Sequence, residues 1–251
     1  MNLWLVLAFL FFIGSLSGWC LELLYRKFFS DANPDRKWIN PGFLSGPYLP
    51  LYGFSLCVLF LLAHIKIVYI DNVIVSKIVL FGIMAIVVTL IEYLAGLIFI
   101  KKMKVKLWDY ENEWGNIKGI ICPKYTFYWM ILSAIYYFII HPKILKSLFW
   151  LSEHLTFSFI MGMFYGVFAM DCYYTMNILA RIREFANEYQ IIVRYEHLKE
   201  HIRLVNEGLK EKRKFIFAFK SDNTNFADNI RNYIEQNIRN LEDNAKKWRK
   251  K

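Results

Sequence analysis

Five long apolar runs dominate the sequence, and they constrain its fold more than any other feature. A helix needs about 20 mostly apolar residues to cross the hydrocarbon core of a bilayer. The chain of 251 residues is 57% apolar, whereas an ordinary soluble domain is about 45–50% apolar. The pattern predicts an all-α fold, a polytopic membrane bundle of about five transmembrane helices, at residues 3–25, 50–67, 74–100, 125–140 and 155–179.

Two of these runs are short. The second is long enough to span a bilayer only if residues 46–49 already belong to it. The fourth is expected to end at residue 140, because His141 and Pro142 follow it and the residue before a proline disfavours helical geometry.

Positive charge is distributed unevenly between the loops, which predicts the orientation. Cytoplasmic loops of membrane proteins carry an excess of Lys and Arg. The net charge of +10 therefore favours an anionic membrane surface over a nucleic acid as the partner. We expect a multi-pass membrane protein with its N-terminus outside and its C-terminus in the cytoplasm. The basic loop residues are Arg26, Lys27, Arg36 and Lys37 in the first loop and Lys101, Lys102, Lys104, Lys106, Lys118 and Lys124 in the third.

The composition changes near residue 180. Residues 1–180 are predicted to form the transmembrane domain, and residues 181–251 a basic cytoplasmic tail. Apolar residues in the tail recur at helical spacing on both sides of a polar break at residues 221–225. This spacing predicts a helical hairpin; alternatively, the basic faces of the two helices lie on anionic lipid.

Three acidic residues lie in apolar runs that cross the membrane in the same predicted direction: Glu22, Glu92 and Asp171. A carboxylate in an apolar helix costs roughly 2.5–3.5 kcal/mol near the bilayer centre, so each of the three needs shelter. All three lie toward the predicted cytoplasmic end, which indicates one shared polar chamber open to the cytoplasm. The alternative is structural: each carboxylate brackets its own loop by accepting backbone N–H bonds.

The first and third loops share a pattern of polar and small residues. Each has an aromatic residue near a polar one, then two glycines four residues apart, then a proline at the next helix. Irregular backbone at membrane depth must be buried or must line a wet cavity. The parallel supports the hypothesis of an internal duplication, as in transporters whose site lies between repeats. The predicted site comprises Glu22, Tyr25, Arg26, Asn40, Gly42, Gly46, Tyr52, Glu92, Trp108, Asp109, Tyr110, Asn116, Asp171 and Tyr174.

These motifs resemble a known bacterial family over about residues 10–180, namely the CmpB-like, or type IV, ABC-transporter permeases. The resemblance implies a small multi-pass protein of the bacterial inner membrane, and the family's name implies transport. The matching residues are Gly14-Ser15, Gly18-Trp19, Glu22, Tyr25-Arg26, Asn40-Pro41-Gly42-Phe43-Leu44, Gly46-Pro47, Pro50, Tyr52-Gly53, Glu92-Tyr93, Gly96, Trp108-Asp109-Tyr110, Asn116, Gly119-Ile120-Ile121-Cys122 and Trp129.

Other chemical motifs are weak in this sequence. No G-x-x-x-x-G-K-[ST] phosphate loop occurs, so any ATP hydrolysis has to come from a separate subunit. The run from His197 to His201 matches the H-x-x-E-H zinc pattern, but it lies in a highly charged tail and is expected to be a solvated helix face. We expect no cofactor, no metal and no nucleic-acid partner.

The sequence favours a permease-like subunit or carrier, whose acidic residues suit a cationic solute or proton coupling. Its expected partners are the lipid bilayer and either a separate ATPase subunit or further copies of itself. Two alternatives remain open. One is a membrane-embedded enzyme that uses a buried carboxylate as acid or base on a lipid headgroup. The other is a non-catalytic scaffold or sensor whose tail binds a partner.

Overall fold

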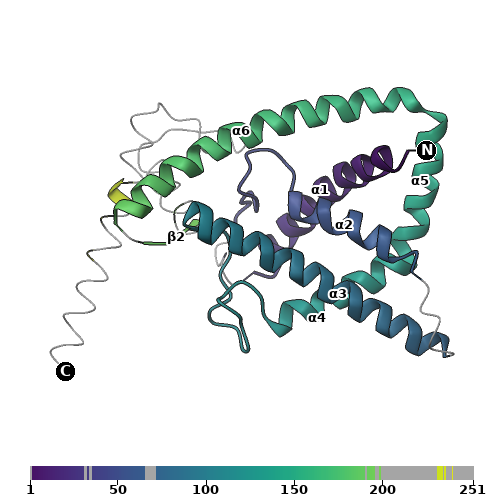
Figure 1. Ribbon diagram of the computed structural model, residues 1–251, viewed down its shortest axis with the longest axis horizontal. Coiled ribbons are helices and arrows are strands. Elements are labelled where there is room, and N and C mark those ends of the chain that lie inside the picture. The colour runs from purple at the N-terminus through teal and green to yellow at the C-terminus, as the bar shows by residue number, and fades with distance from the viewer. Residues whose placement is uncertain are drawn as a thin grey trace. The chain divides into compact units, whose positions relative to one another are not determined.

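The chain is mostly helical in the computed structural model (Figure 1). The structure describes residues 2–30, 33, 36–65, 72–189, 191–195, 198, 231–233, 235 and 239. Its α-helices are α1 (Leu3–Phe28), α2 (Pro50–Leu62), α3 (Val73–Ile98), α4 (Pro123–Ile135), α5 (His141–Glu153) and α6 (Ser158–Glu188). Shorter elements are the π-helices Phe99–Met103 and Tyr136–Ile140, the 3₁₀ helix Leu155–Phe157, and the strands β1 (Val105–Lys106) and β2 (Val193–Arg194).

Four helices in the described part of the chain are long and apolar enough to cross a membrane: Leu3–Phe28, Val73–Met103, Pro123–Glu153 and Leu155–Glu188. The α2 helix is apolar but has only 13 residues. At 1.5 Å per residue it is about 20 Å long, shorter than a hydrocarbon core of about 30 Å. The helical membrane class is therefore confirmed, while the count of five spans stays a prediction.

The chain forms two compact units. The first contains Met1–Ala95 and Tyr110–Cys172, and the second contains Gly96–Asp109 and Tyr173–Lys251. The predicted division near residue 180 stays a prediction. Most of the predicted tail hairpin lies outside the described residues, as do His197 and His201.

A helical element ends at Ile140, where the fourth apolar run was predicted to end, but the chain stays helical beyond His141-Pro142. A π-helical turn, Tyr136–Ile140, follows α4 and leads directly into α5, which continues to Glu153. Pro142 lies in the first turn of α5, the helical position at which proline is best tolerated. The proline therefore starts a new helical segment, and the chain changes direction between α4 and α5 (Figure 1).

Small residues let α1 and α2 approach closely within the first unit. A Cβ added at Gly18 would lie 2.2 Å from the Cβ of Tyr52, and one at Gly53 would lie 2.3 Å from the Oγ of Ser15. Small residues four apart allow such contact between membrane helices, and Gly14 and Gly18 have this spacing. The close packing of α1 and α2 places Tyr52 next to the last two turns of α1.

Two apolar clusters lie among the described residues of the first unit. One joins α1 and α2 to α5 and the start of α6, and the other joins α3 to α2 and α4. The buried members are Val6, Phe9, Leu10, Phe60, Tyr136, Ile144, Leu148, Leu151 and Met161 in the first cluster, and Leu80, Phe81 and Met84 in the second.

The second unit contains a short parallel pairing of β1 with β2. Val105 lies opposite Val193 in this pair, and both side chains are buried. The N–H of Val193 also donates to the carbonyl of Lys104 at 2.9 Å. This pairing ties the start of the third loop to the residues that follow α6.

Candidate functional site

Glu22 lies in the last two turns of α1, where both of its carboxylate oxygens accept hydrogen bonds. Its Oε1 accepts from the Nε of Arg26 at 3.1 Å, and its Oε2 accepts from the hydroxyl of Tyr52 at 3.0 Å. About a quarter of the side chain is exposed, 24%. Glu22 therefore has both a counter-charge and partial contact with the surroundings.

Glu92 lies in the last two turns of α3 and is only 4% exposed. The hydroxyl of Tyr110 donates to its Oε1 at 3.1 Å, and the indole Nε1 of Trp129 donates to its Oε2 at 3.0 Å. Both donors are neutral, and no basic side chain among the described residues pairs with this carboxylate. Because a buried charge without a partner is costly, Glu92 is the strongest candidate for a functional group.

Aromatic side chains connect the two glutamates. The rings of Tyr52 and Trp129 contact each other with 5.6 Å between centroids. Tyr110 stacks on Tyr125 at 4.3 Å, and the hydroxyls of Tyr125 and Tyr25 share a hydrogen bond of 3.3 Å. The chain of contacts thus returns to α1. We call this network the glutamate site and define it as Glu22, Tyr25, Arg26, Tyr52, Glu92, Tyr110, Tyr125 and Trp129.

The electrostatics of Tyr110 support treating the two glutamates as one site. Burial raises the pKa of the Tyr110 hydroxyl well above its ordinary value, and the negative charges of Glu92 and Glu22 raise it further. The hydroxyl therefore stays protonated and keeps donating to Glu92. Both carboxylates act on this one group, so they lie within electrostatic reach of a common point.

The first loop is shaped by Asn40 and contributes to the site indirectly. Its Oδ1 accepts from the Nε1 of Trp19 at 2.8 Å and from the N–H of Gly42 at 3.1 Å. Its Nδ2 donates to the carbonyls of Leu44 and Ser45. Asn40 and Gly42, both predicted site residues, thus form a hydrogen-bonded turn anchored on α1.

Asp171, on α6, brackets the same loop. It accepts from the backbone N–H of Ser45 at 3.2 Å, from that of Gly46 at 2.8 Å, and from the hydroxyl of Tyr48 at 2.6 Å. Gly46 must be small, since an added Cβ would lie 2.3 Å from the ring of Tyr48. Asp171 thus accepts backbone N–H bonds, as in the structural alternative, but from the first loop and not from the loop beside its own helix. A place for Asp171 in a chamber shared with the glutamates stays a prediction.

The remaining predicted residues are placed as follows. Asn116 shapes the third loop, because its Nδ2 donates to the carbonyls of Glu111 and Glu113 and its Oδ1 accepts from Gly119. Trp108, Asp109 and Tyr174 belong to the second unit. There Asp109 pairs with Lys106 at 2.6 Å and with Arg194 at 3.3 Å, while Tyr174 is 61% exposed.

Sequence reasoning missed two members of the glutamate site, Tyr125 and Trp129. Both follow Pro123, which opens α4, and they lie four residues apart on one helix face. A usable signal existed for Trp129, because a buried carboxylate such as Glu92 needs a hydrogen-bond donor from a neighbouring helix.

A family model described as "Putative ABC-transporter type IV" matches residues 9–176. The matched range contains every residue of the glutamate site and extends from α1 into α6. No curated protein and no solved structure matches the chain.

Proposed function

Because the chain belongs to the type IV, CmpB-like ABC-transporter family, we propose that it is the membrane-spanning subunit of a transporter and that its glutamate site binds a positively charged solute. The observation that carries this proposal is Glu92. It is 4% exposed and accepts hydrogen bonds only from neutral donors among the described residues. A bound cation would supply the missing counter-charge.

The rest of the site suits the same ligand. Two carboxylates and the guanidinium of Arg26 leave one net negative charge. The faces of Tyr and Trp rings attract cations, by about 0.5–1 kcal/mol at exposed positions and about 2 kcal/mol when desolvated. Proton coupling fits this arrangement too, since a proton on Glu92 and a bound cation would each cancel the same charge.

We further propose the orientation that the loop charges indicate, with the N-terminus outside, the C-terminus in the cytoplasm and α2 as a short fifth crossing. This places the glutamate site in the cytoplasmic half of the membrane. A Ser30→Cys variant without the native cysteines tests it. A membrane-impermeant maleimide should label position 30 only after the cells are permeabilised; labelling in intact cells would refute the orientation.

The energy source is proposed to be a separate ATPase subunit, since the chain has no phosphate-loop motif. The protein, tagged at its C-terminus and purified from native membranes in mild detergent, should bring an ATPase with it. Membranes carrying the untagged protein are the control. Absence of an ATPase from the tagged sample alone would leave a carrier without that partner.

Cation binding is tested with tetramethylammonium on the protein in lipid nanodiscs. Quenching or enhancement of tryptophan fluorescence should report binding, because Trp129 donates directly to Glu92. Sodium chloride at equal ionic strength is the salt control. Glu92→Gln should shift the response to much higher tetramethylammonium concentration, whereas Glu113→Gln, which changes a loop glutamate paired with Lys124, should not. Equal responses from both variants would refute the site.

A further inference from the structure

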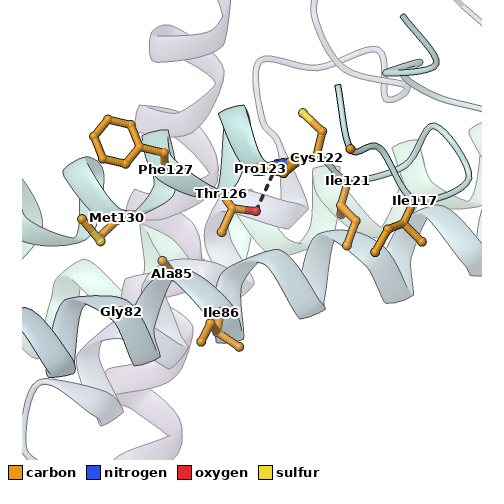
Figure 2. Close-up of a pocket in the computed structure, with 11 residues that line it drawn as sticks. Gly82, Ala85, Ile86, Ile117, Ile121, Cys122, Pro123, Thr126, Phe127 and Met130 are labelled. Atoms are coloured by element: carbon orange, nitrogen blue, oxygen red, sulfur yellow. Dashed lines mark hydrogen bonds between the residues drawn. The ribbon is translucent and has the colours of Figure 1, made fainter. Parts of the chain in front are cut away.

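An apolar cavity of about 500 Å³ lies between α3 and α4 (Figure 2). Cavities of about 300–1,000 Å³ with mostly apolar walls are typical of small-molecule sites. Figure 2 shows α3 on one side, α4 on the other and part of the third loop closing one end. The residues that matter here are Gly82, Ala85 and Ile86 of α3, Thr126 and Phe127 of α4, and Ile117 of the loop.

The cavity is open to its surroundings. Ile86, Phe127 and Ile117 on its rim are 65%, 55% and 51% exposed. A Cβ added at Gly82 would meet nothing within 4 Å. Because α3 and α4 belong to helices long and apolar enough to cross a membrane, we expect acyl chains beside the part of the rim that these helices form, so that an apolar molecule can enter from the bilayer.

Two threonines connect the cavity to the glutamate site. Thr126 lines the cavity, and its Oγ1 lies 3.3 Å from the Oγ1 of Thr89 on α3. Glu92 lies one turn after Thr89, and Trp129, which donates to Glu92, lies one turn after Thr126. The polar hydroxyl pair therefore stands between the apolar cavity and the buried carboxylate.

The same face of α3 runs from the cavity to the carboxylate. Gly82, Ala85, Thr89 and Glu92 follow the spacing i, i+3, i+7 and i+10 of a single helical stripe. At 1.5 Å per residue this stripe is about 15 Å long. Along its length the stripe presents apolar residues first, then the hydroxyl of Thr89 and then the carboxylate of Glu92. A binding site for an amphiphile has this order of apolar and charged groups.

We propose that the solute is an amphiphile with a compact positive head and a single apolar tail. The head lies at Glu92 and the tail lies in the cavity between α3 and α4. This inference rests on the proposed function and specifies its substrate class. Charge complementarity selects the occupant: a neutral chain would leave Glu92 uncompensated, and a phosphate-bearing lipid would bring a negative group toward it.

Three probes test the two halves of the site on the protein in lipid nanodiscs, with partitioning into empty nanodiscs subtracted. They are dodecyltrimethylammonium, tetramethylammonium, which lacks the tail, and dodecanol, which lacks the charge. Dodecyltrimethylammonium should bind at least about tenfold more tightly than either of the others, because it alone places a positive charge at Glu92 and a tail in the cavity. Equal binding of dodecanol would overturn the proposal, because the cavity would then accept any apolar chain.

Substitutions test which residues bind the tail and which bind the charged head. Gly82→Leu places a side chain in the cavity and should remove the advantage of dodecyltrimethylammonium over tetramethylammonium. Gly162→Leu is the matched control, because its added Cβ also meets nothing within 4 Å and Gly162 lies on α6. Glu92→Gln should remove the advantage over dodecanol.

The two proposals fail in different ways. If tetramethylammonium binds and Glu92→Gln weakens its binding, but a tail adds nothing or Gly82→Leu and Gly162→Leu behave alike, the amphiphile proposal is refuted and the cation site stands. If tetramethylammonium binding is absent or indifferent to Glu92→Gln, the cation site itself is refuted.

Discussion

Glu22 and Glu92 occupy equivalent places in two helix–loop–helix segments but have different environments. Each lies in the last two turns of an apolar helix, and each accepts a hydrogen bond from an aromatic side chain in the first two turns of the next helix. Glu22 also pairs with Arg26 and is partly exposed, whereas Glu92 is buried with neutral donors only among the described residues. The equivalent position thus holds a carboxylate with a counter-ion in the first segment, and one with neutral donors among the described residues in the second.

This likeness agrees with the hypothesis of an internal duplication, which stays a hypothesis. The difference indicates how a duplicated unit can divide its roles. A carboxylate with a fixed counter-ion organises structure, while one without a counter-ion is available for a mobile charge.

The largest expected effect is on folding stability, and it should differ between the two segments because their helices pack differently. Gly18→Leu should destabilise the protein by about 3 kcal/mol or more, because its Cβ would lie 2.2 Å from the Cβ of Tyr52. Gly82→Leu, on α3, should leave stability nearly unchanged, since the space there is open. Thermal unfolding in detergent compares the two variants, and equal midpoints would contradict the close packing of α1 on α2.

The second prediction concerns charge. Glu92→Gln should weaken tetramethylammonium binding by about tenfold to a hundredfold, the size of one charge-assisted contact. Its stability should stay equal or rise, because a buried unpaired charge is removed. Glu22→Gln should weaken binding less, since Arg26 already offsets that carboxylate. Unfolding of Glu92→Gln with unchanged Glu22→Gln would show that Glu92 is structural.

The third prediction concerns the aromatic donors. Trp129→Phe should destabilise the protein by about 1–2 kcal/mol, because it leaves a buried carboxylate oxygen without its donor. Tyr52→Phe should cost less, as the partly exposed Glu22 can find another partner. Chemical or thermal unfolding measures both changes, and the reverse order would contradict the assigned burial of the two glutamates.

The smallest effect should come from the counter-ion. Arg26→Gln should strengthen tetramethylammonium binding by about threefold, since partly exposed ion pairs contribute only about 0.2–1 kcal/mol. The same change in the Glu92→Gln background should restore part of the lost binding by uncovering Glu22. Lys27→Gln, one residue further along α1, is the matched control for general loss of charge. No difference between the Arg26 and Lys27 variants would remove Arg26 from the site.

Much of the site could be predicted, because its acids stand out in apolar runs. Glu22, Glu92 and the aromatic residues Tyr25, Tyr52 and Tyr110 were all predicted, and the structure joins them in one network. Asp171 was grouped with them by its expected depth in the membrane, and it accepts backbone N–H bonds from Ser45 and Gly46 in the first loop. The position of a residue along a helix gives its expected depth in the membrane. The rotation of the helix about its axis, which the position does not give, decides which loop or helix the side chain faces.

The sequence by itself determined the membrane class, the helical composition and the family, since each follows from apolar run length or from the order of local motifs. Only the tertiary structure decided which partners each carboxylate has. Pairing Glu92 with Trp129 and Tyr110, and placing an apolar cavity on the same face of α3, depend on how α3 and α4 pack and on the path of the third loop. These contacts join residues far apart in the chain, and no local pattern encodes the distance between them.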